Sequence, residues 1–449
     1  MDIIATVTAT PPPQRLPMGP IWFEVVNSAS WSVVLGAPML LFLKAHDAPA
    51  IVLGAAVALS SLFQVLQPLG ARLLHHRGFR GTMVRGWTAR TVLTVLIVGV
   101  IWWSERLGPG WTVALTLVLL SGFCIIRGLT SCAWMPWMSQ LVPDILRGRF
   151  LAASQGSMQV TTLLCQAGYA LILAKVPGVP GFTLLFIWSA LMGWGAAWML
   201  ARIPDRPVEA EGPPGPVAWR SLLGHQPFRA LLAFNLVAWI AFAGAGVLWV
   251  PVLRDLYGCS DGFIALMPVW AGLAGVATLP LLSRILDRVG SRPVLALALV
   301  VAALHFVLWA MLAARVLPLS LPTLIAIQVT GGAAFTAWGV ANTRLAMGCV
   351  PPQGRSHYFA LHGAVAALGY GVFPIVWGGL LDLLAAHGGT GWRITAHAWL
   401  YLAMAVIAVA ALAWHRRLIE PEALSNAAFL SELRRLPGRA WARWGVDRS

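Results

Sequence analysis

Long apolar runs recur along this chain of 449 residues and limit the folds that it can adopt. A helix that crosses a lipid bilayer needs about 20 mainly apolar residues, and twelve runs of this kind are present. They lie at about 20–43, 50–73, 88–104, 111–134, 151–174, 181–201, 229–253, 261–283, 293–313, 319–343, 356–382 and 395–415. Because lipid offers the backbone no hydrogen-bond partners, and because the runs do not alternate strictly, they are predicted to be helices of an all-α membrane protein.

The composition excludes whole classes of protein. Charged residues make up 10% of the chain and hydrophobic residues 59%, whereas an ordinary soluble domain has roughly 25% charged residues. A water-soluble enzyme could not bury that much apolar surface. The sequence has no ATP-binding P-loop, no zinc-protease motif and no nucleophile elbow, so we expect no enzymatic activity, no cofactor and no bound metal.

The formal net charge of +15 raises the question of a nucleic-acid partner. The basic residues form short clusters between the apolar runs rather than one stripe, so membrane topology explains them better and no nucleic acid is expected. With the N-terminus inside, 24 basic residues fall on the inner side and 6 on the outer side, and Arg127 remains within a span. Arg90 is counted here on the inner side, among the arginines that surround the second connection. This bias predicts that both termini are cytoplasmic, in a multi-pass protein of the bacterial inner (plasma) membrane.

The two halves of the chain share sequence patterns. Three pairs of motifs recur in the same order, with offsets of 208, 208 and 212 residues. They are Asn27-x-x-x-Trp31 with Asn235-x-x-x-Trp239, Val142-Pro143-x-x-x-Arg147 with Val350-Pro351-x-x-x-Arg355, and Arg72-x-Leu74-x-x-x-Gly78-x-Arg80 with Arg284-x-Leu286-x-x-x-Gly290-x-Arg292. A repeat of this kind predicts two pseudo-symmetric six-helix bundles with the same orientation.

The repeat sets the expected domain boundaries. They are an N-terminal arm (1–19), an N-terminal bundle (20–203), a linker rich in proline and charge (204–228), a C-terminal bundle (229–415) and a tail (416–449), with arm, linker and tail all cytoplasmic.

The loop between the eighth and ninth runs, which contains Asp287, Arg288, Gly290 and Arg292, resembles the cytoplasmic loop signature of the major facilitator superfamily (MFS). This resemblance implies secondary transport by alternating access, with spans one, four, seven and ten around a central cavity. Gly78 and Arg80 occupy the matching loop of the first half, where His75 replaces the signature aspartate. Asp287 is expected to hold a cytoplasmic latch that breaks during gating, whereas the arginines can equally serve only to fix orientation.

Ionisable groups inside spans are expensive, which makes Glu24 and Arg127 candidates for function. Their depths agree to within a few ångström if the helices rise by about 1.5 Å per residue. If spans one and four are neighbours, the two side chains can form an ion pair. In a functional interpretation Glu24 binds a proton or Arg127 meets an anionic substrate. In a structural interpretation the pair is permanent, or Glu24 extends to the interface.

The repeated asparagines and tryptophans suggest a binding surface. Asn27 and Trp31, like Asn235 and Trp239, are four residues apart and share a helix face, where they could orient a planar or sugar-like ligand. Packing and hydrogen bonding between the halves explain the same pattern equally well. Other tryptophans, including Trp87, are assigned to the membrane interfaces.

Further candidates come from the resemblance and from a side chain that can titrate near neutral pH. The resemblance adds Gln328, Trp338 and Asn342 in span ten to the candidate cavity. His362 in span eleven is a candidate for proton coupling because histidine titrates near neutral pH, although a carbonyl can satisfy it instead.

These patterns predict a secondary active transporter that moves a small molecule across the lipid bilayer, coupled to protons. The alternative is a transporter-like membrane protein that does not transport and acts in assembly or sensing.

Overall fold

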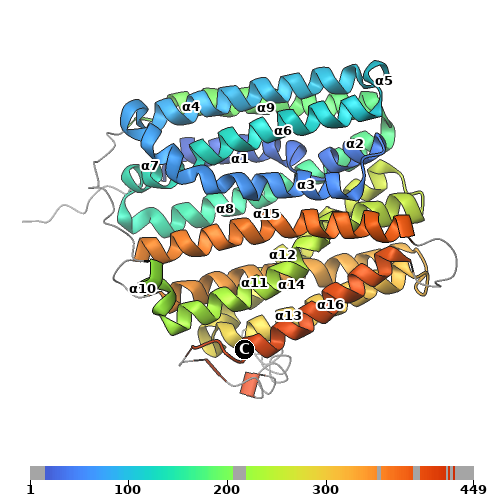
Figure 1. Ribbon diagram of the computed structural model, residues 1–449. Coiled ribbons are helices and arrows are strands. Elements are labelled where there is room, and N and C mark those ends of the chain that lie inside the picture. The colour runs from blue at the N-terminus through green and yellow to red at the C-terminus, as the bar shows by residue number, and fades with distance from the viewer. Residues whose placement is uncertain are drawn as a thin grey trace, which may run out of the picture.

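The computed structural model describes residues 16–205, 219–350, 355–387, 395–420, 423–424 and 428–429. In these residues the regular structure is helical, and twelve helical spans are long and apolar enough to cross a membrane (Figure 1). The all-α class and the number of spans predicted from the apolar runs are therefore confirmed.

The first six spans are formed by α1–α9, and several of them are broken or kinked. Their helices are α1 (Met18–Val34), α2 (Ala37–Ala45), α3 (Ala50–Leu62) with the 3₁₀ turn η1 (Phe63–Leu66), α4 (Gln67–Trp102), α5 (Ser104–Leu107), α6 (Pro109–Ser131), α7 (Trp134–Leu141), α8 (Asp144–Lys175) and α9 (Val179–Arg202).

The last six spans are formed by α11–α16. The helices of this half are α10 (Trp219–Gly224), α11 (Gln226–Pro251) with the π-helical turn η2 (Val252–Leu256), α12 (Asp261–Val289), α13 (Ser291–Ala313), α14 (Leu321–Cys349), α15 (Arg355–His387) and α16 (Ala396–His415).

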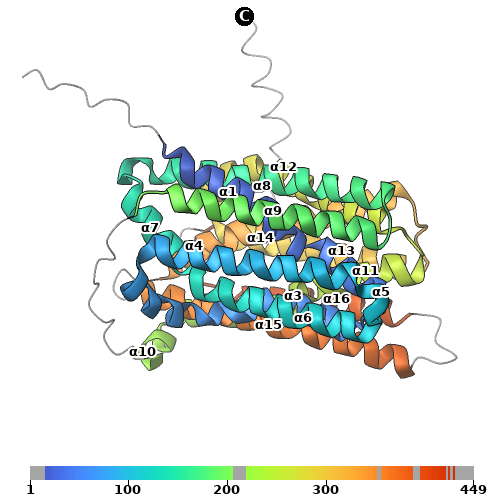
Figure 2. The ribbon, with the colours of Figure 1, turned by 90° about the horizontal axis from the view of Figure 1, so that it is seen from above.

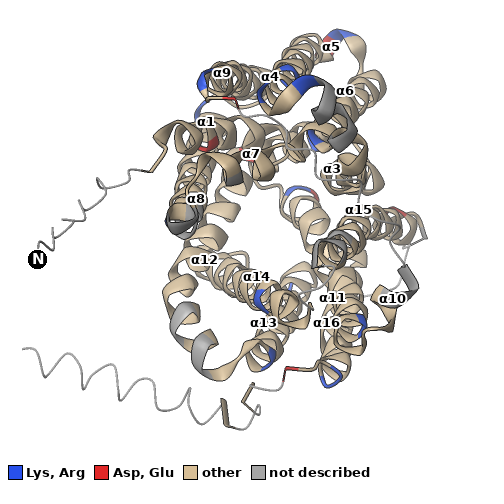
Figure 3. Ribbon diagram, turned by 90° about the vertical axis from the view of Figure 1, so that its left-hand side faces the viewer, with Lys and Arg blue, Asp and Glu red and all other residues tan. Residues whose placement is uncertain are grey.

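The long helices run side by side along one direction, as Figures 1 and 2 show. We call the end where α1 begins, α9 ends and α11 begins the linker end, and the opposite end the far end. Viewed from the linker end in Figure 3, the helices of each half group together, α3 lies beside α15 and α8 lies beside α12.

Glycines let the two halves approach closely. A Cβ atom at Gly54 of α3 would collide with the Pro374 backbone of α15, and one at Gly378 of α15 would collide with the Ala50 backbone. On the other seam, Gly262 of α12 packs directly on the backbone of Ala174 in α8. Small residues at such contacts are how membrane helices gain packing energy without a hydrophobic driving force.

The third span differs from its predicted extent of 88–104. The structure places it at Arg77–Trp102, so Arg90 lies near its middle and not in the preceding loop. Gly78, with φ of 68°, interrupts α4, and the helix continues from there. Phe79, Met83, Trp87 and Arg90 are buried in this helix, whereas Arg77, Arg80 and Arg85 are exposed. The count of Arg90 among the inner basic residues was therefore wrong.

Candidate functional site

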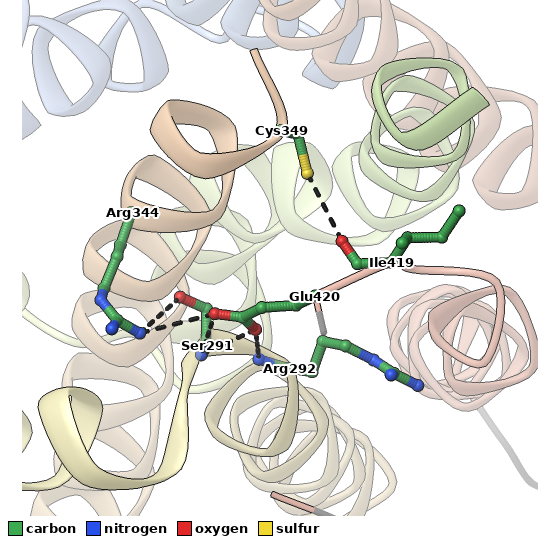
Figure 4. Close-up of polar contacts among 6 residues, drawn as sticks. All are labelled: Ser291, Arg292, Arg344, Cys349, Ile419 and Glu420. Atoms are coloured by element: carbon green, nitrogen blue, oxygen red, sulfur yellow. Dashed lines mark hydrogen bonds and ion pairs between the residues drawn. The ribbon is translucent and has the colours of Figure 1, made fainter. Parts of the chain in front are cut away.

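The predicted gating loop of the C-terminal half is held by an acid from outside the signature. Gly290, with φ of 83°, ends α12, and α13 begins at the next residue. Glu420, which follows α16, accepts hydrogen bonds from the backbone N–H groups of Ser291 at 2.9 Å and Arg292 at 2.8 Å (Figure 4). Arg344 of α14 contacts the same carboxylate at 3.5 Å. Glu420 thus connects the start of α13 to α14 and to the segment after α16.

The N-terminal half repeats this arrangement in a weaker form. Asp205, which follows α9, accepts a hydrogen bond from the backbone N–H of Arg80 at 3.2 Å. The Arg80 Nε atom lies 3.8 Å from the same carboxylate. The side chains of Asp287 and Arg288, which the signature suggested as the latch, lie outside the described part of the chain, as does that of His75.

The far end carries polar links between the two halves. Lys44, at the end of α2, forms an ion pair with Asp255 of η2 at 2.7 Å. Asp382 of α15 accepts hydrogen bonds from the backbone N–H groups of Ala50 and Ile51, both at 2.8 Å, and so caps α3. Among the side chains that the structure describes, these are links that join the two halves at the far end.

Glu24 is buried in the N-terminal half, with 7% of its surface exposed. The side chains of Asn27 and Trp134 lie near its carboxyl group and can donate hydrogen bonds to it. Asn27 in turn accepts a hydrogen bond from Trp87 Nε1 at 3.0 Å. Trp87, expected at the membrane interface, is therefore a buried link between α4 and α1.

Arg127 does not form the anticipated ion pair with Glu24. Its Nη1 donates instead to the Ser60 carbonyl of α3 at 3.4 Å. A second arginine lies nearby: Arg90 of α4 is buried, and the charges of Arg90 and Arg127 are close enough to interact. The Arg90 guanidinium carbon lies 4.5 Å from the Trp87 ring centre and 4.4 Å from that of Phe123. Sequence reasoning missed Arg90 because the predicted span began eleven residues too late, which put Arg90 at its inner edge; Gly78 was the available signal for the earlier start.

The C-terminal half holds the equivalent asparagine differently. Asn235 is fully buried, and its Nδ2 lies 3.0 Å from Nε2 of His362 in α15. Its Oδ1 is buried and has no hydrogen-bond partner in the described residues, as is true of Asn342 Oδ1. Asn27 and Asn235 therefore each bond to a helix of their own half and do not join the halves to each other.

The repeated tryptophans have different surroundings. Trp239 is buried against His362 and Tyr370, with ring-centre distances of 5.9 and 5.8 Å, whereas Trp31 is only partly buried. Trp338 of α14 packs against Phe234 and Phe242 in the core of the C-terminal half.

A cavity of about 340 Å³ lies within the C-terminal half. Aromatic side chains from α11, α13, α14 and α15 line most of it, and the predicted residue Gln328 adds an amide; the lining includes Phe242, Trp249, Trp309, Gln328, Phe335 and Tyr370. Its size is at the lower end of the range for small-molecule sites, and an apolar wall with a few polar groups is typical of them.

Comparison with known proteins agrees with this architecture. The family model of the Major Facilitator Superfamily matches residues 24–346. Among solved structures, a D-xylose–proton symporter is 18% identical (TM-score 0.69, covering 90% of this chain and 97% of that one). The nucleoside transporter NupG is 14% identical (0.63, 90% and 99%), and a bacterial homologue of the iron transporter ferroportin in the inward-facing state is 12% identical (0.67, 89% and 97%).

No curated protein sequence is similar enough to this chain to indicate a closer relative. The family match, however, extends over most of the chain, and the shared fold covers nearly all of it. This protein is a multi-pass membrane protein that belongs to the Major Facilitator Superfamily, a family of transporters and not of enzymes.

Proposed function

We propose that this protein moves a small solute across the membrane by alternating access, with its linker end in the cytoplasm. The observation that carries the proposal is that polar links between described residues hold the two halves together at the far end. In this orientation the far end is closed and the solute site is reached from the cytoplasm. The excess of basic residues on the linker side supports the orientation.

The links at the far end are suited to repeated opening. Both partners of the Lys44–Asp255 pair are partly exposed, and exposed ion pairs contribute about 0–1 kcal/mol each. The Asp382 cap adds about 1 kcal/mol, the usual value for a side chain that caps a helix. Breaking these links costs little enough for solute binding to shift the balance between the two states.

We propose further that protons drive this transport and that Glu24 carries the proton. The Glu24 carboxyl group is buried, and the described residues that contact it donate hydrogen bonds and carry no positive charge. A proton can therefore bind without breaking an ion pair. The helices packed against α1 carry further titratable side chains, which include Lys44 of α2, Cys165, Tyr169 and Lys175 of α8 and Arg202 of α9. Tyr169 bonds to Ser32 and not to Glu24. His362 beside Asn235 is the second candidate for coupling.

A protein that acts only in assembly or sensing is the competing function. Such a protein has no need for a buried carboxyl group without a cationic partner, and that feature favours transport over a static role.

Purified protein in liposomes tests both functions. A panel of small solutes is added under an imposed proton gradient, while solute uptake and internal pH are followed. We expect at least one solute to accumulate with proton movement in wild type, and Glu24→Gln to abolish accumulation above equilibrium. Glu105→Gln, at an exposed glutamate between two spans, is the matched control. Failure of folded wild-type protein to move any solute would contradict transport and favour the assembly or sensor function.

A further inference from the structure

Two arginines within the spans of the N-terminal half, Arg90 and Arg127, have no acid as an ion-pair partner in the described residues. Arg90 lies near the middle of its span, and its buried Nε–H has no acceptor in the described residues. Arg127 has five N–H donors, of which the structure engages one, in a long bond of 3.4 Å to Ser60. The two charges are close enough to repel each other.

The described acids of this half are not placed to balance these arginines. Glu24 lies within a span, but it is held by Asn27 and Trp134. Asp47 and Glu105 lie between spans at the far end, and Asp205 follows the sixth span at the linker end. In the described part of the chain, no carboxylate forms an ion pair with Arg90 or Arg127.

An arginine in the membrane interior is costly unless an anion accompanies it. The rings of Trp87 and Phe123 on either side of Arg90 offset part of this cost through cation–π attraction. They leave the net charge unchanged, and they leave the Arg90 Nε–H without an acceptor in the described residues. The missing partner is therefore an anion that comes from outside the chain.

We propose that Arg90 and Arg127 bind the negatively charged group of the transported solute, a small organic anion with a flat apolar body. This inference rests on the transport function proposed above and specifies the class of its substrate. Guanidinium groups match carboxylates and phosphates through paired hydrogen bonds, so both kinds of anionic group fit the chemistry of the site.

The expected apolar body follows from the cavity in the C-terminal half. Gly246, which lines this cavity, packs against Val57 of α3. Ser60, the acceptor for Arg127, lies one helical turn further along the same helix. The aromatic cavity and Arg127 thus contact neighbouring turns of α3. A solute of the size of an aromatic acid can therefore place its charged group in the N-terminal half and its ring against the C-terminal half. A ligand that contacts both halves can couple binding to their movement.

The test uses the full chain in detergent at constant ionic strength, with benzoate, phenyl phosphate, the neutral isostere benzamide, and chloride as probes. Binding is measured by thermal shift and calorimetry. We expect benzoate or phenyl phosphate to raise the melting temperature and benzamide and chloride to have no effect; comparison of the two anions shows whether the site prefers carboxylate or phosphate. Equal binding of benzamide, a response to chloride alone, or no response to either organic anion would overturn the inference.

Substitutions locate the site. Arg127→Gln should weaken anion binding at least about tenfold, and Arg127→Lys should restore part of it, because lysine keeps the charge but not the paired donors. Arg106→Gln, at an exposed arginine of the far end, is the matched control. Since Arg90 is buried and its loss can impair folding, Arg90→Lys serves as its test, with monodispersity checked first. Unchanged anion binding in folded Arg127→Gln would contradict the proposal.

The liposome assay separates this inference from the transport function. Transport of neutral solutes alone would leave the function standing and remove the anion site. Anion binding at Arg127 without movement of any solute would keep the site and contradict transport.

Discussion

Asp205 and Glu420 occupy equivalent positions in the two halves: each follows the last helix of its half and accepts backbone N–H groups where a helix begins after a glycine with positive φ. Glu420 makes two such bonds at 2.8–2.9 Å and also contacts Arg344, whereas the bond from the Arg80 backbone to Asp205 is longer, at 3.2 Å. The pseudo-symmetry of the sequence motifs therefore extends to the acids that hold them, with an asymmetry in the length of these bonds.

This asymmetry predicts unequal losses of stability. Glu420→Ala should lower the free energy of unfolding by about 1–3 kcal/mol, because two buried N–H groups lose a charged acceptor. Asp205→Ala should cost less than about 1 kcal/mol, as its contact is longer and more exposed. Melting temperatures in detergent measure both. A larger loss for Asp205→Ala would contradict the ranking.

The two glycines at these turns should also differ. Gly290→Ala introduces a Cβ 2.7 Å from the Cβ of Ala423, at a φ of 83°, whereas the nearest atom at Gly78 is 3.6 Å away, at a φ of 68°. Both changes strain the backbone by about 1–2 kcal/mol, and Gly290→Ala adds a collision. We expect Gly290→Ala to lower the melting temperature more than Gly78→Ala does. Gly348→Ala, at a helical glycine with open space around it, is the control and should be neutral or stabilising.

Trp87 should be required for stability rather than for anchoring. Trp87→Phe removes the donor to Asn27 Oδ1 and leaves a buried acceptor unsatisfied, at a cost of about 1–3 kcal/mol. The control is Trp102→Phe, because the side chain of Trp102 is 66% exposed. Thermal unfolding of the two variants tests this prediction. Equal melting temperatures would contradict a stabilising role for the Trp87 hydrogen bond.

The reactivity of Cys259 should report opening of the far end. Cys259 lines a cavity of about 550 Å³ between the halves, together with Ala174 and Asp261, and burial raises the pKa of its thiol. Because the thiolate is the reactive form, labelling by an impermeant maleimide should be slow at pH 7.5 and rise about tenfold per pH unit up to that pKa. Asp382→Ala should open this end, return the pKa toward its ordinary value and speed labelling at pH 7.5 several-fold.

Cys259→Ser identifies the labelled residue in that experiment, and Glu105→Ala controls for the loss of a far-end carboxylate. A labelling rate that Asp382→Ala leaves unchanged would mean that the Asp382 cap does not hold the far end closed.

The sequence predicted the architecture well because span length and repeated motifs are local properties of the chain. It placed Gly78 and Gly290 in matching loops of the two halves, and both residues have positive φ values. It could not predict that Glu24 and Arg127 have separate partners, because those contacts depend on how α1, α3, α4 and α7 pack together. Arg90 was misplaced because a run of arginines resembles a loop in a hydropathy profile, even when the residues between them pack into the bundle.

Transport by alternating access requires the two halves to move reciprocally about a site between them. Pairs of spin labels test this movement in protein whose native cysteines are replaced, with Gly156 and Gly348 labelled at the linker end and Gly110 and Val316 at the far end; all four positions are exposed. Pulsed dipolar spectroscopy then compares the distances within each pair with and without Lys44→Met and Asp382→Ala. We expect these substitutions to lengthen the far-end distance and shorten the linker-end distance. Distances that both stay unchanged, or that both lengthen, would contradict it.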